Sequence, residues 1–391
     1  MKIERVFFAS AGDADIILAH EAWRRGEQLA SEVSITFSSQ IEDFARDIGA
    51  KLLMVSTRGD GRVVDDGPTR LEHVVKRNQR GWRYHAEQLR YCWLLVGKAR
   101  AFRADIALID SGVTHFFMLA LFPLFGIRVV PLLHNCLWPH GYRPTSRVQK
   151  IIQKLDAWFW RHGATAALAV SPEAERQVTE LAGPRHCPVH QIRAQFNPAF
   201  FEPIPEPDRH ARPFHVIFIG RVTEAKGVLD IPAMASYIET RAPGLVRWTV
   251  CGRGDALDAL RAEIACCGLT NIVATPGWVS LEQLQRIYAQ AHASIVPTRS
   301  GFAEGLAMTA AEAVLAGRPI VSNPIVPALE VLAPAAMAAR SNDPESHASA
   351  ILALASDPML YDRLQAACAT LGQPFYDRER GLAAVLRRAL G

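Results

Sequence analysis

Two glutamates, Glu304 and Glu312, stand eight positions apart around the start of an alanine-rich segment. Glu304 ends a loop of small and polar residues, and Glu312 lies in a run of strong helix formers. Eight residues span a little over two helical turns, so Glu312 is expected on the side that faces the helix start. The amides of Gly305, Leu306 and Ala307 would point out of a helix N-terminus, which suits a diphosphate. A carboxylate two turns farther on can accept both hydroxyls of a ribose, so the segment predicts a nucleoside diphosphate site.

Cations and glycines follow several of the apolar runs. Arg221 and Lys226 come after HVIFIG, which ends at Gly220, and their charged tips are expected to converge on phosphates. Gly252 belongs to a G-x-G turn, a weak signal by itself because any tight strand-to-helix turn favours glycine. Gly12 follows the first apolar run and opens a helix, where a missing side chain would let a phosphate or a sugar approach the backbone.

Four segments of the C-terminal half carry a family resemblance. In chain order they are FHVIFIGRVTEAKGVLDI, WTVCGRGDALDALRAEI, TPGWVSLEQLQRIYAQAHASIVPT and EGLAMTAAE. They resemble the motifs of the retaining glycosyltransferases of family 4, whose signature is E-x7-E and whose fold is GT-B. The resemblance implies a retaining transfer of a sugar from a UDP or GDP sugar to an acceptor hydroxyl. It also implies bacterial polysaccharide or glycolipid assembly, with no metal and no further cofactor.

The same resemblance implies roles for single residues. Glu304 would contact the donor sugar, Val279 would border the base, and His134, after the run VVPLLHN, would approach the donor sugar. The predicted catalytic residues are His134, Arg221, Lys226 and Glu304. The predicted donor-binding residues are Gly12, Gly220, Gly252, Val279, Gly305, Leu306, Ala307 and Glu312.

The chain departs from the family pattern in places, which leaves alternatives open. The first loop has Ala-Gly-Asp where two adjacent glycines are usual, and Leu306 and Ala307 stand where an aromatic residue and glycine are common. A nucleotide-sugar epimerase of the same fold and a non-catalytic binding subunit are the alternatives. Asp13 and Asp15 spell D-x-D, a metal motif of another glycosyltransferase fold. At a helix start we instead expect Asp13 to cap the helix and Asp15 to favour its dipole.

Short apolar runs alternate with longer amphipathic ones, which predicts α/β architecture with two doubly wound, Rossmann-like domains. In the first half we expect strands at 5–9, 34–37, 51–56, 106–109, 129–133 and 166–170, and helices at 16–25 and 147–161. A proline-rich stretch at 202–213 predicts a domain boundary. The expected domains are 1–204 for the acceptor, 205–372 for the nucleotide sugar, and a helix at 373–391 that returns to the first domain by family resemblance.

The 391 residues carry a formal net charge of +4, too mild to imply nucleic acid. Between Arg70 and Arg103, nine Lys or Arg face only two acids, with tryptophan and tyrosine interleaved. This segment is either a solvated helical face or a surface for an anionic membrane or a lipid-linked acceptor. Seven cysteines without C-x-x-C spacing favour reduced thiols. With no leader-like segment, we expect a cytoplasmic protein, peripheral at most at the inner face of the membrane.

Overall fold

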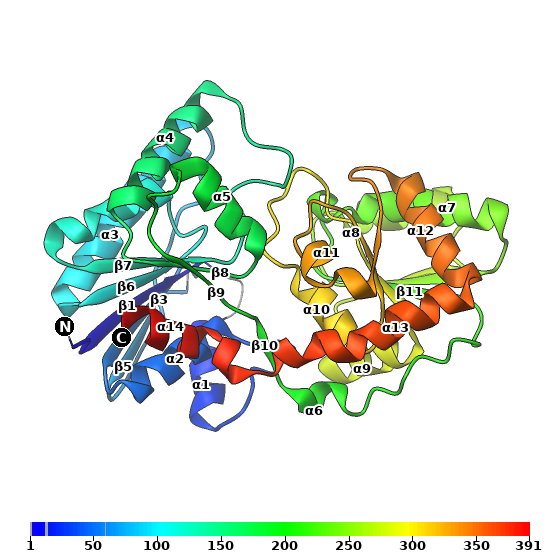
Figure 1. Ribbon diagram of the computed structural model, residues 1–391, viewed down its shortest axis with the longest axis horizontal. Helices are drawn as coiled ribbons and strands as arrows, with labels where there is room; N and C mark the ends of the chain where they lie inside the picture. Colours follow the sequence, from blue (N-terminus) through cyan, green and yellow to red (C-terminus); the bar gives the residue numbers. More distant parts are fainter. Residues whose placement is uncertain (1, 12–14, 59) are drawn as a thin grey trace. The chain divides into compact units, whose positions relative to one another are not determined.

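The computed structural model describes residues 2–11, 15–58 and 60–391. The chain forms two compact units: unit 1 is Met1–Leu137, Pro144–Gln195 and Arg378–Gly391, and unit 2 is Trp138–Arg143 and Phe196–Asp377. Each unit holds a mainly parallel sheet with helices on both faces (Figure 1). The predicted α/β, doubly wound class is therefore confirmed. The predicted domain boundaries at 204/205 and 372/373 stay predictions.

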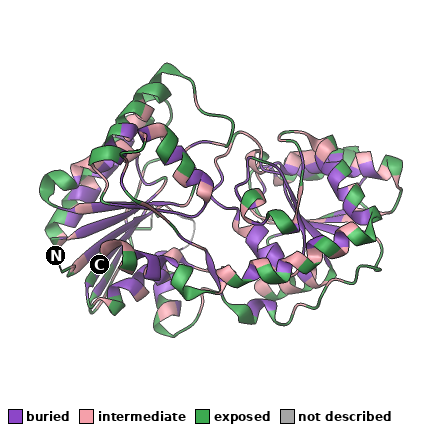
Figure 2. Cartoon of the chain, viewed as in Figure 1, coloured by how far each residue is buried: buried purple, intermediate pink, exposed green. Residues whose placement is uncertain are grey.

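Unit 1 is built on an eight-stranded sheet of order β4-β5-β3-β1-β6-β7-β8-β9. Its strands are β1 (Arg5–Ser10), β3 (Lys51–Ser56), β4 (Val63–Asp66), β5 (Thr69–His73), β6 (Ile106–Asp110), β7 (Arg128–Leu133), β8 (Ala167–Ala169) and β9 (Val189–Gln191). The pairs within this sheet are parallel except for β4, which runs antiparallel to β5. Its central strands are buried along nearly their whole length, as expected for a sheet covered on both faces (Figure 2).

The strand order in unit 1 reverses at β1, which pairs with β3 on one side and β6 on the other. Phe7 lies opposite Leu53 in β3 and Ala107 in β6. Strands β3, β5 and β4 follow on one side of β1, and β6, β7, β8 and β9 follow on the other. Such a reversal leaves a crevice beyond the carboxyl ends of the strands, where ligands bind in open α/β sheets.

One predicted strand is wrong over half of its length. Only Ser34–Ile35 (β2) of the predicted strand 34–37 is extended, and it lies outside the eight-stranded sheet. Helix α2 begins at Phe37, because Thr36 is extended and its side chain accepts a hydrogen bond from the Ser39 amide. The β4–β5 hairpin was not predicted, because neither strand has an apolar run: β4 is partly exposed, and β5 is largely buried but rich in polar residues.

The helices of unit 1 are α1 (Ile16–Arg24), α2 (Phe37–Asp47), α3 (Trp82–Phe102), α4 (Arg147–His162), α5 (Pro172–Ala182) and α14 (Leu382–Leu390). The 3₁₀ segments η1 (Phe116–Leu121) and η2 (Pro123–Phe125) follow β6. The last helix, α14, packs on α2, where the Leu382 amide donates to Gln40 Oε1 at 2.8 Å and Arg387 pairs with Asp47.

Unit 2 contains a six-stranded parallel sheet of order β13-β12-β11-β14-β15-β16. Its strands are β11 (Phe214–Ile219), β12 (Val246–Cys251), β13 (Val273–Gly277), β14 (Ala293–Val296), β15 (Ile320–Ser322) and β16 (Ala336–Ala338). The helices are α6 (Pro198–Phe201), α7 (Ile231–Arg241), α8 (Leu257–Cys266), α9 (Leu281–Gln290), α10 (Met308–Leu315), α11 (Ala328–Val331), α12 (Pro344–Ser356) and α13 (Pro358–Gly372). Its core includes Val216, Trp248, Leu260 and Ile351, all buried. Among the described residues, no helix has the length and apolar character needed to cross a bilayer.

Asp156 gives unit 1 a pH-dependent stability. Asp156 belongs to α4, and its Oδ1 accepts a hydrogen bond from the Phe117 amide at 2.8 Å. Burial raises the pKa of Asp156 to about 7. The unfolded carboxyl titrates near the ordinary value of about 3.9, so the folded state binds the proton more tightly. Stability from this group is present at low pH and is lost as pH rises from about 4 to about 7.

We expect Asp156→Asn to stabilise the protein at pH 8 by about 2 kcal/mol, because the amide oxygen keeps the Phe117 bond without a buried charge. The gain should shrink as the pH falls to 5, where the wild-type carboxyl is protonated. Urea unfolding of both proteins at pH 5, 6, 7 and 8 measures it. A difference that does not change with pH would contradict the assignment.

Candidate active site

The carboxyl ends of β11 and β14 lie side by side, because the strand order of unit 2 reverses between them. β11 pairs in parallel with β12 on one side and with β14 on the other, where Val216 lies opposite Ala293. The loop after β11 carries Arg221 and Lys226, and the loop after β14 leads to Glu304. The reversal therefore brings two predicted parts of the site, far apart in sequence, to one edge of the sheet.

Glu304 is held at this edge by two donors. Its Oε1 pairs with the Lys226 ammonium and accepts the Thr298 hydroxyl at 2.7 Å. Glu304 and Thr298 are both buried. Within the described part of the chain, neither donor engages Oε2, which stays available as an acceptor. Glu304 does not cap the helix that follows, because that N-cap is Ala307.

Phe302 brings the two predicted cations together. The Lys226 Nζ lies 4.5 Å from the centre of the Phe302 ring, and the Arg221 guanidinium carbon lies 5.5 Å from it. Attraction between a cation and an aromatic face holds such tips in place. Phe302 was not predicted, although an aromatic residue two positions before Glu304 was the available signal. Arg221, Lys226 and Glu304 thus form one cluster around this ring.

The helix after Glu304 starts later than predicted. α10 begins at Met308, so the amides without an intrahelical partner belong to its first turn rather than to Gly305 and Leu306. Leu306 is buried, and Ala307 adopts φ 68° and ψ 89° as the N-cap. The Ala307 carbonyl accepts the Ala310 amide at 3.0 Å. A helix N-terminus therefore opens near the Glu304 cluster, and of the three predicted amides only that of Ala307, the N-cap, belongs to it.

Glu312 lies inside α10 and is buried, so it is not a solvent-facing helix residue. It lies beside Tyr288 of α9, a tyrosine that is fully buried. Burial, and then the neighbouring Glu312 carboxylate, raise the pKa of Tyr288 well above its usual value. Tyr288 was not predicted as a neighbour, because nothing in the spacing of α9 marks one buried tyrosine. The ribose contact of Glu312 stays a prediction.

The glycines of the β11 and β12 loops allow the two backbones to touch. The Val222 amide donates to the Arg253 carbonyl at 2.8 Å. A Cβ on Gly252 would lie 1.8 Å from the Gly220 carbonyl oxygen, and a Cβ on Gly254 would lie 2.0 Å from the Val222 oxygen. Gly252 also has φ +141°. Packing alone therefore requires glycine at 252, and its contact with a donor stays a prediction.

Val279 follows β13 and is half-buried. The residue before it, Trp278, is exposed, and the Arg253 guanidinium lies 5.1 Å from the centre of its ring. An exposed aromatic ring with a cation above it borders the loop that was predicted to face the base. The base contact of Val279 remains a prediction.

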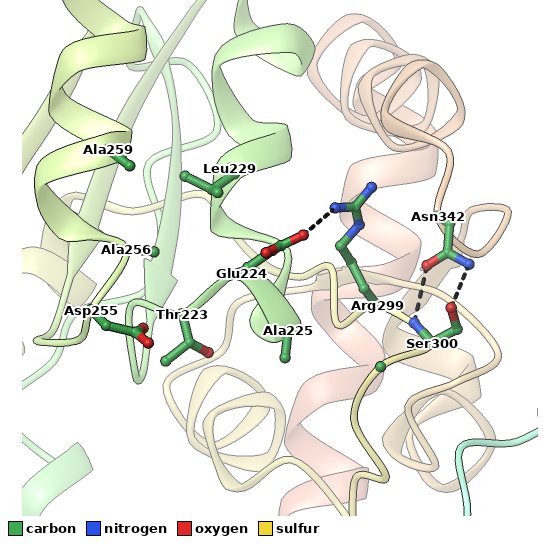
Figure 3. Close-up of a pocket in the computed structure, with 11 residues that line it drawn as sticks. Thr223, Glu224, Ala225, Leu229, Asp255, Ala256, Ala259, Arg299, Ser300 and Asn342 are labelled. Carbon is green, nitrogen blue, oxygen red and sulfur yellow. Dashed lines mark hydrogen bonds and ion pairs between the residues drawn. The ribbon is translucent and has the colours of Figure 1, made fainter. Parts of the chain in front are cut away.

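A cavity of about 910 Å³ opens beside this cluster (Figure 3). It is lined by residues of the same two loops, among them Thr223, Glu224, Arg299 and Ser300, but not by Arg221, Lys226, Glu304 or Glu312. Arg299 pairs with Glu224 at 3.5 Å and with Asp230 at 3.4 Å. Asn342 binds both the Ser300 amide, at 3.0 Å, and its hydroxyl, at 2.9 Å. These contacts hold the loop that leads to Glu304 in place. We therefore assign the residues that line the cavity a structural role in positioning this loop.

His134 lies at the carboxyl end of β7 in unit 1. Its Nε2 is 2.6 Å from Asp110 Oδ1 at the end of β6, and its ring lies 4.3 Å from that of Phe37. Its amide donates to Ser111 Oγ at 3.1 Å. A carboxylate on one ring nitrogen fixes the tautomer and orientation of the imidazole. Asp110 was missed, although a carboxylate ending an apolar strand was the signal. His134 belongs to unit 1, whereas the Glu304 cluster belongs to unit 2, and each is described within its own unit.

Gly12 and Asp13 lie outside the described residues. The cap of α1 is Asp15, in place of the predicted Asp13; its side chain accepts the Ile17 and Leu18 amides at 2.9 and 3.2 Å. Asp15, Asp60 and His73 approach one another closely enough to resemble a metal site. Arg62, however, binds Asp15 at 2.6 Å and Asp60 at 2.8 Å, and so brings positive charge between the carboxylates.

The basic segment from Arg70 to Arg103 uses several of its charges internally. Arg70 and Lys98 both bind Glu72, and Arg90 binds Glu87 at 2.6 Å. Lys76 donates to two backbone carbonyls, at 3.0 and 2.8 Å, and burial lowers its pKa. The segment is therefore a folded network in large part, and its predicted membrane contact stays a prediction.

Comparisons with known protein families find a similarity in the C-terminal half of the chain. Residues 213–357 match the glycosyl transferases group 1 family. The amylovoran biosynthesis glycosyltransferase AmsK of Erwinia amylovora is 29% identical over 115 residues, which cover 29% of this chain and 28% of that protein. The alignment thus spans less than a third of this curated relative.

Solved structures are similar over nearly the whole chain. Sucrose-phosphate synthase from Thermosynechococcus elongatus gives a TM-score of 0.73 at 15% identity and covers 99% of this chain and 98% of that chain. The fold is GT-B. Anabaena HepE, solved in complex with UDP and glucose, gives a TM-score of 0.67 at 15% identity and covers 100% of both chains. At this identity the likeness concerns the fold alone.

We expect Gly252→Ala to destabilise the protein by about 3 kcal/mol, because its Cβ would overlap the Gly220 carbonyl. The control is Gly97→Ala, at an exposed position of α3 with open space around the added Cβ. That change should be neutral or stabilise by up to about 1 kcal/mol. Urea unfolding measures both variants, and equal stabilities would contradict the packing account.

Proposed function

We propose that this protein is a retaining glycosyltransferase that moves a sugar from a nucleoside-diphosphate sugar, of the UDP type, to an acceptor hydroxyl. One observation carries the proposal. Arg221 and Lys226 meet Glu304 around one aromatic ring, at the point where the strand order of the unit 2 sheet reverses. This is a ready site for a diphosphate beside a carboxylate that can hold a sugar hydroxyl.

Three comparisons support the proposal. The stretch 213–357 matches glycosyl transferases group 1 and includes the whole cluster. The structure of HepE contains UDP and glucose, which supports a UDP sugar as donor. The name of AmsK refers to amylovoran biosynthesis, which supports a role in bacterial polysaccharide or glycolipid assembly.

The cluster offers two cations for a departing diphosphate and one carboxylate for the sugar. As the glycosidic bond breaks, negative charge grows on the oxygen that joins the sugar to the phosphates. Arg221 and Lys226 would stabilise this charge, together with the first-turn amides of α10. Glu304, with Oε1 already bound to Lys226 and Thr298, would accept a hydroxyl of the donor sugar through Oε2. Because these side chains supply the positive charge, we propose that the reaction needs no metal.

Retention follows from a front-face displacement. In this proposal the leaving phosphate oxygen takes the proton of the acceptor hydroxyl while the new glycosidic bond forms on the same face. Glu304 serves the donor sugar as a hydrogen-bond acceptor, so no covalent glycosyl-enzyme is needed. A glycosyl adduct trapped on any carboxylate and found by mass spectrometry would contradict this step. The acceptor, a glycan or a lipid-linked sugar, would bind unit 1, where His134 is held by Asp110.

A thermal-shift panel of UDP, GDP, ADP, CDP and NAD, with and without EDTA, tests the donor site. We expect UDP at about 100 times its dissociation constant to add about 2.7 kcal/mol of stability, unchanged by EDTA. Glu312→Gln should remove most of the shift, because a neutral amide is a weaker acceptor for the ribose hydroxyls. The control is Glu282→Gln on α9, whose carboxylate is 80% exposed and should not affect binding. A shift with NAD alone would reject the proposal.

We expect Arg221→Ala to lower kcat by about 10²–10³, because one donor to the developing charge is lost. The melting temperature should stay close to that of wild type, since Arg221 is exposed. UDP release from the donor identified by the panel, with and without acceptor sugars, measures the rate. Arg286→Ala, which removes a 73% exposed cation of α9, is the control. Conversion of the donor into its epimer without an acceptor would indicate the epimerase instead.

A further inference from the structure

Helix α4 carries a row of large apolar side chains on its exposed face. Val148, Ile151, Leu155 and Trp158 are each between 43% and 60% exposed. Their spacing of three, four and three residues places them on one face of a helix. Single exposed hydrophobic residues are normal in folded proteins, but four in register on one helix face indicate an interaction surface. We name these four residues the α4 stripe.

The α4 stripe lies opposite the face that anchors α4 to unit 1. Ala157, Phe159 and Trp160 are buried, and Trp160 packs on Phe116 with ring centres 4.9 Å apart. At 100° per residue, Ala157 and Trp160 point about half a turn away from the stripe, whereas Phe159 falls at its edge near the end of the helix. The core of unit 1 is therefore complete without the stripe. Figure 2 shows exposed positions along the length of this helix.

Cations border the α4 stripe. Arg147, Lys150, Lys154 and Arg161 are all exposed, and their helical positions fall together along one side of the stripe. The only acid of the helix, Asp156, lies on the buried side and accepts the Phe117 amide. The exposed surface of α4 is thus apolar and positively charged, without a compensating carboxylate of its own.

The distribution of apolar surface between the units is uneven. Among the described residues, the large exposed hydrophobic side chains lie mostly in unit 1, and only Tyr142, Trp278 and Met359 belong to unit 2. Large exposed apolar side chains are therefore concentrated in unit 1, which contains the α4 stripe.

We propose that α4 is a membrane-docking helix, which lies in the headgroup region of an anionic bilayer with the α4 stripe inserted and Lys150 and Lys154 on the lipid phosphates. An amphipathic helix of this composition binds through apolar burial and through attraction to anionic lipids together. The charges favour lipid over a second copy of the chain, because two α4 surfaces in contact would bring like charges together. The proposal does not depend on the reaction chemistry, since neither the stripe nor its cations belong to the Glu304 cluster.

Docking by α4 differs from the contact expected of the segment between Arg70 and Arg103. In that segment Arg70, Arg90 and Lys98 are engaged by Glu72 and Glu87. On α4, four exposed apolar side chains and the exposed Lys150 and Lys154 lie within one helix of 16 residues. Our proposal therefore concerns α4, and the contact predicted for the segment between Arg70 and Arg103 stays a separate prediction.

Sedimentation with vesicles of 70% phosphatidylcholine and 30% phosphatidylglycerol tests the proposal on the full chain. We expect wild type to bind these vesicles and to bind pure phosphatidylcholine at least about tenfold more weakly. Ile151→Glu with Leu155→Glu should lower the partition coefficient on the mixed vesicles by at least about tenfold. Both side chains are exposed, so the melting temperature should stay unchanged. Met359→Glu, at an 84% exposed apolar position of unit 2, is the control and should bind as wild type does.

A second pair of variants tests the charge. Lys150→Gln with Lys154→Gln should weaken binding to the mixed vesicles by about fivefold per lysine removed, and the loss should disappear at high salt. Lys2→Gln with Lys51→Gln makes the same change in net charge at exposed positions away from α4 and should have no such effect.

Three results would overturn the proposal. The first is wild type that fails to bind the mixed vesicles, and the second is binding that is equal for the stripe variant and wild type. The third is a dimer in analytical ultracentrifugation that dissociates in Ile151→Glu with Leu155→Glu, since the stripe would then serve a second copy of the chain. Each result is independent of donor binding, so it is distinguishable from failure of the proposed transferase activity.

Discussion

The site depends on one constraint, the parallel direction of β11 and β14 as neighbours in the sheet of unit 2. Parallel neighbours end at the same edge, so the loops that follow them must meet there, although about 75 residues separate them in sequence. The glycines of the adjoining loops then decide how closely the backbones approach. With no Cβ at 252 or 254, the β12 loop supports the β11 loop through a backbone hydrogen bond, and Arg221 sits on a braced turn.

The charges at this edge are already arranged before a ligand binds. Lys226 is paired with Glu304, and both cations rest on the ring of Phe302, so binding a diphosphate requires little reorientation of side chains. A preorganised site of this kind stabilises developing charge more effectively than mobile groups in water. The same pairing explains why the Glu304 carboxylate can remain buried, because Lys226 and Thr298 compensate it.

Sequence reasoning succeeded where a pattern determined the structure locally. Buried strands are recognisable in the sequence as apolar runs. Arg221, Lys226 and Glu304 follow such runs, so their position at one edge of the sheet was predictable. Sequence reasoning failed where the environment of a residue depends on a neighbour that is distant in sequence. Tyr288 beside Glu312 and Asp110 beside His134 are tertiary contacts between elements that no spacing connects. The helix start at Phe37 was also missed, because the capping Thr36 suits an extended conformation as well as an N-cap.

Ala307 shows how strongly the surrounding structure determines this segment. It has a positive φ, a conformation that favours glycine, and the resembling family commonly has glycine at this position. For alanine the conformation costs on the order of 1 kcal/mol, which persists only when neighbouring contacts impose it. On one side the chain is fixed by the bonds to Glu304 and the burial of Leu306, and on the other by α10 with Glu312 buried. The strained residue therefore lies between two segments that are each held by their surroundings, one at Glu304 and one at Glu312.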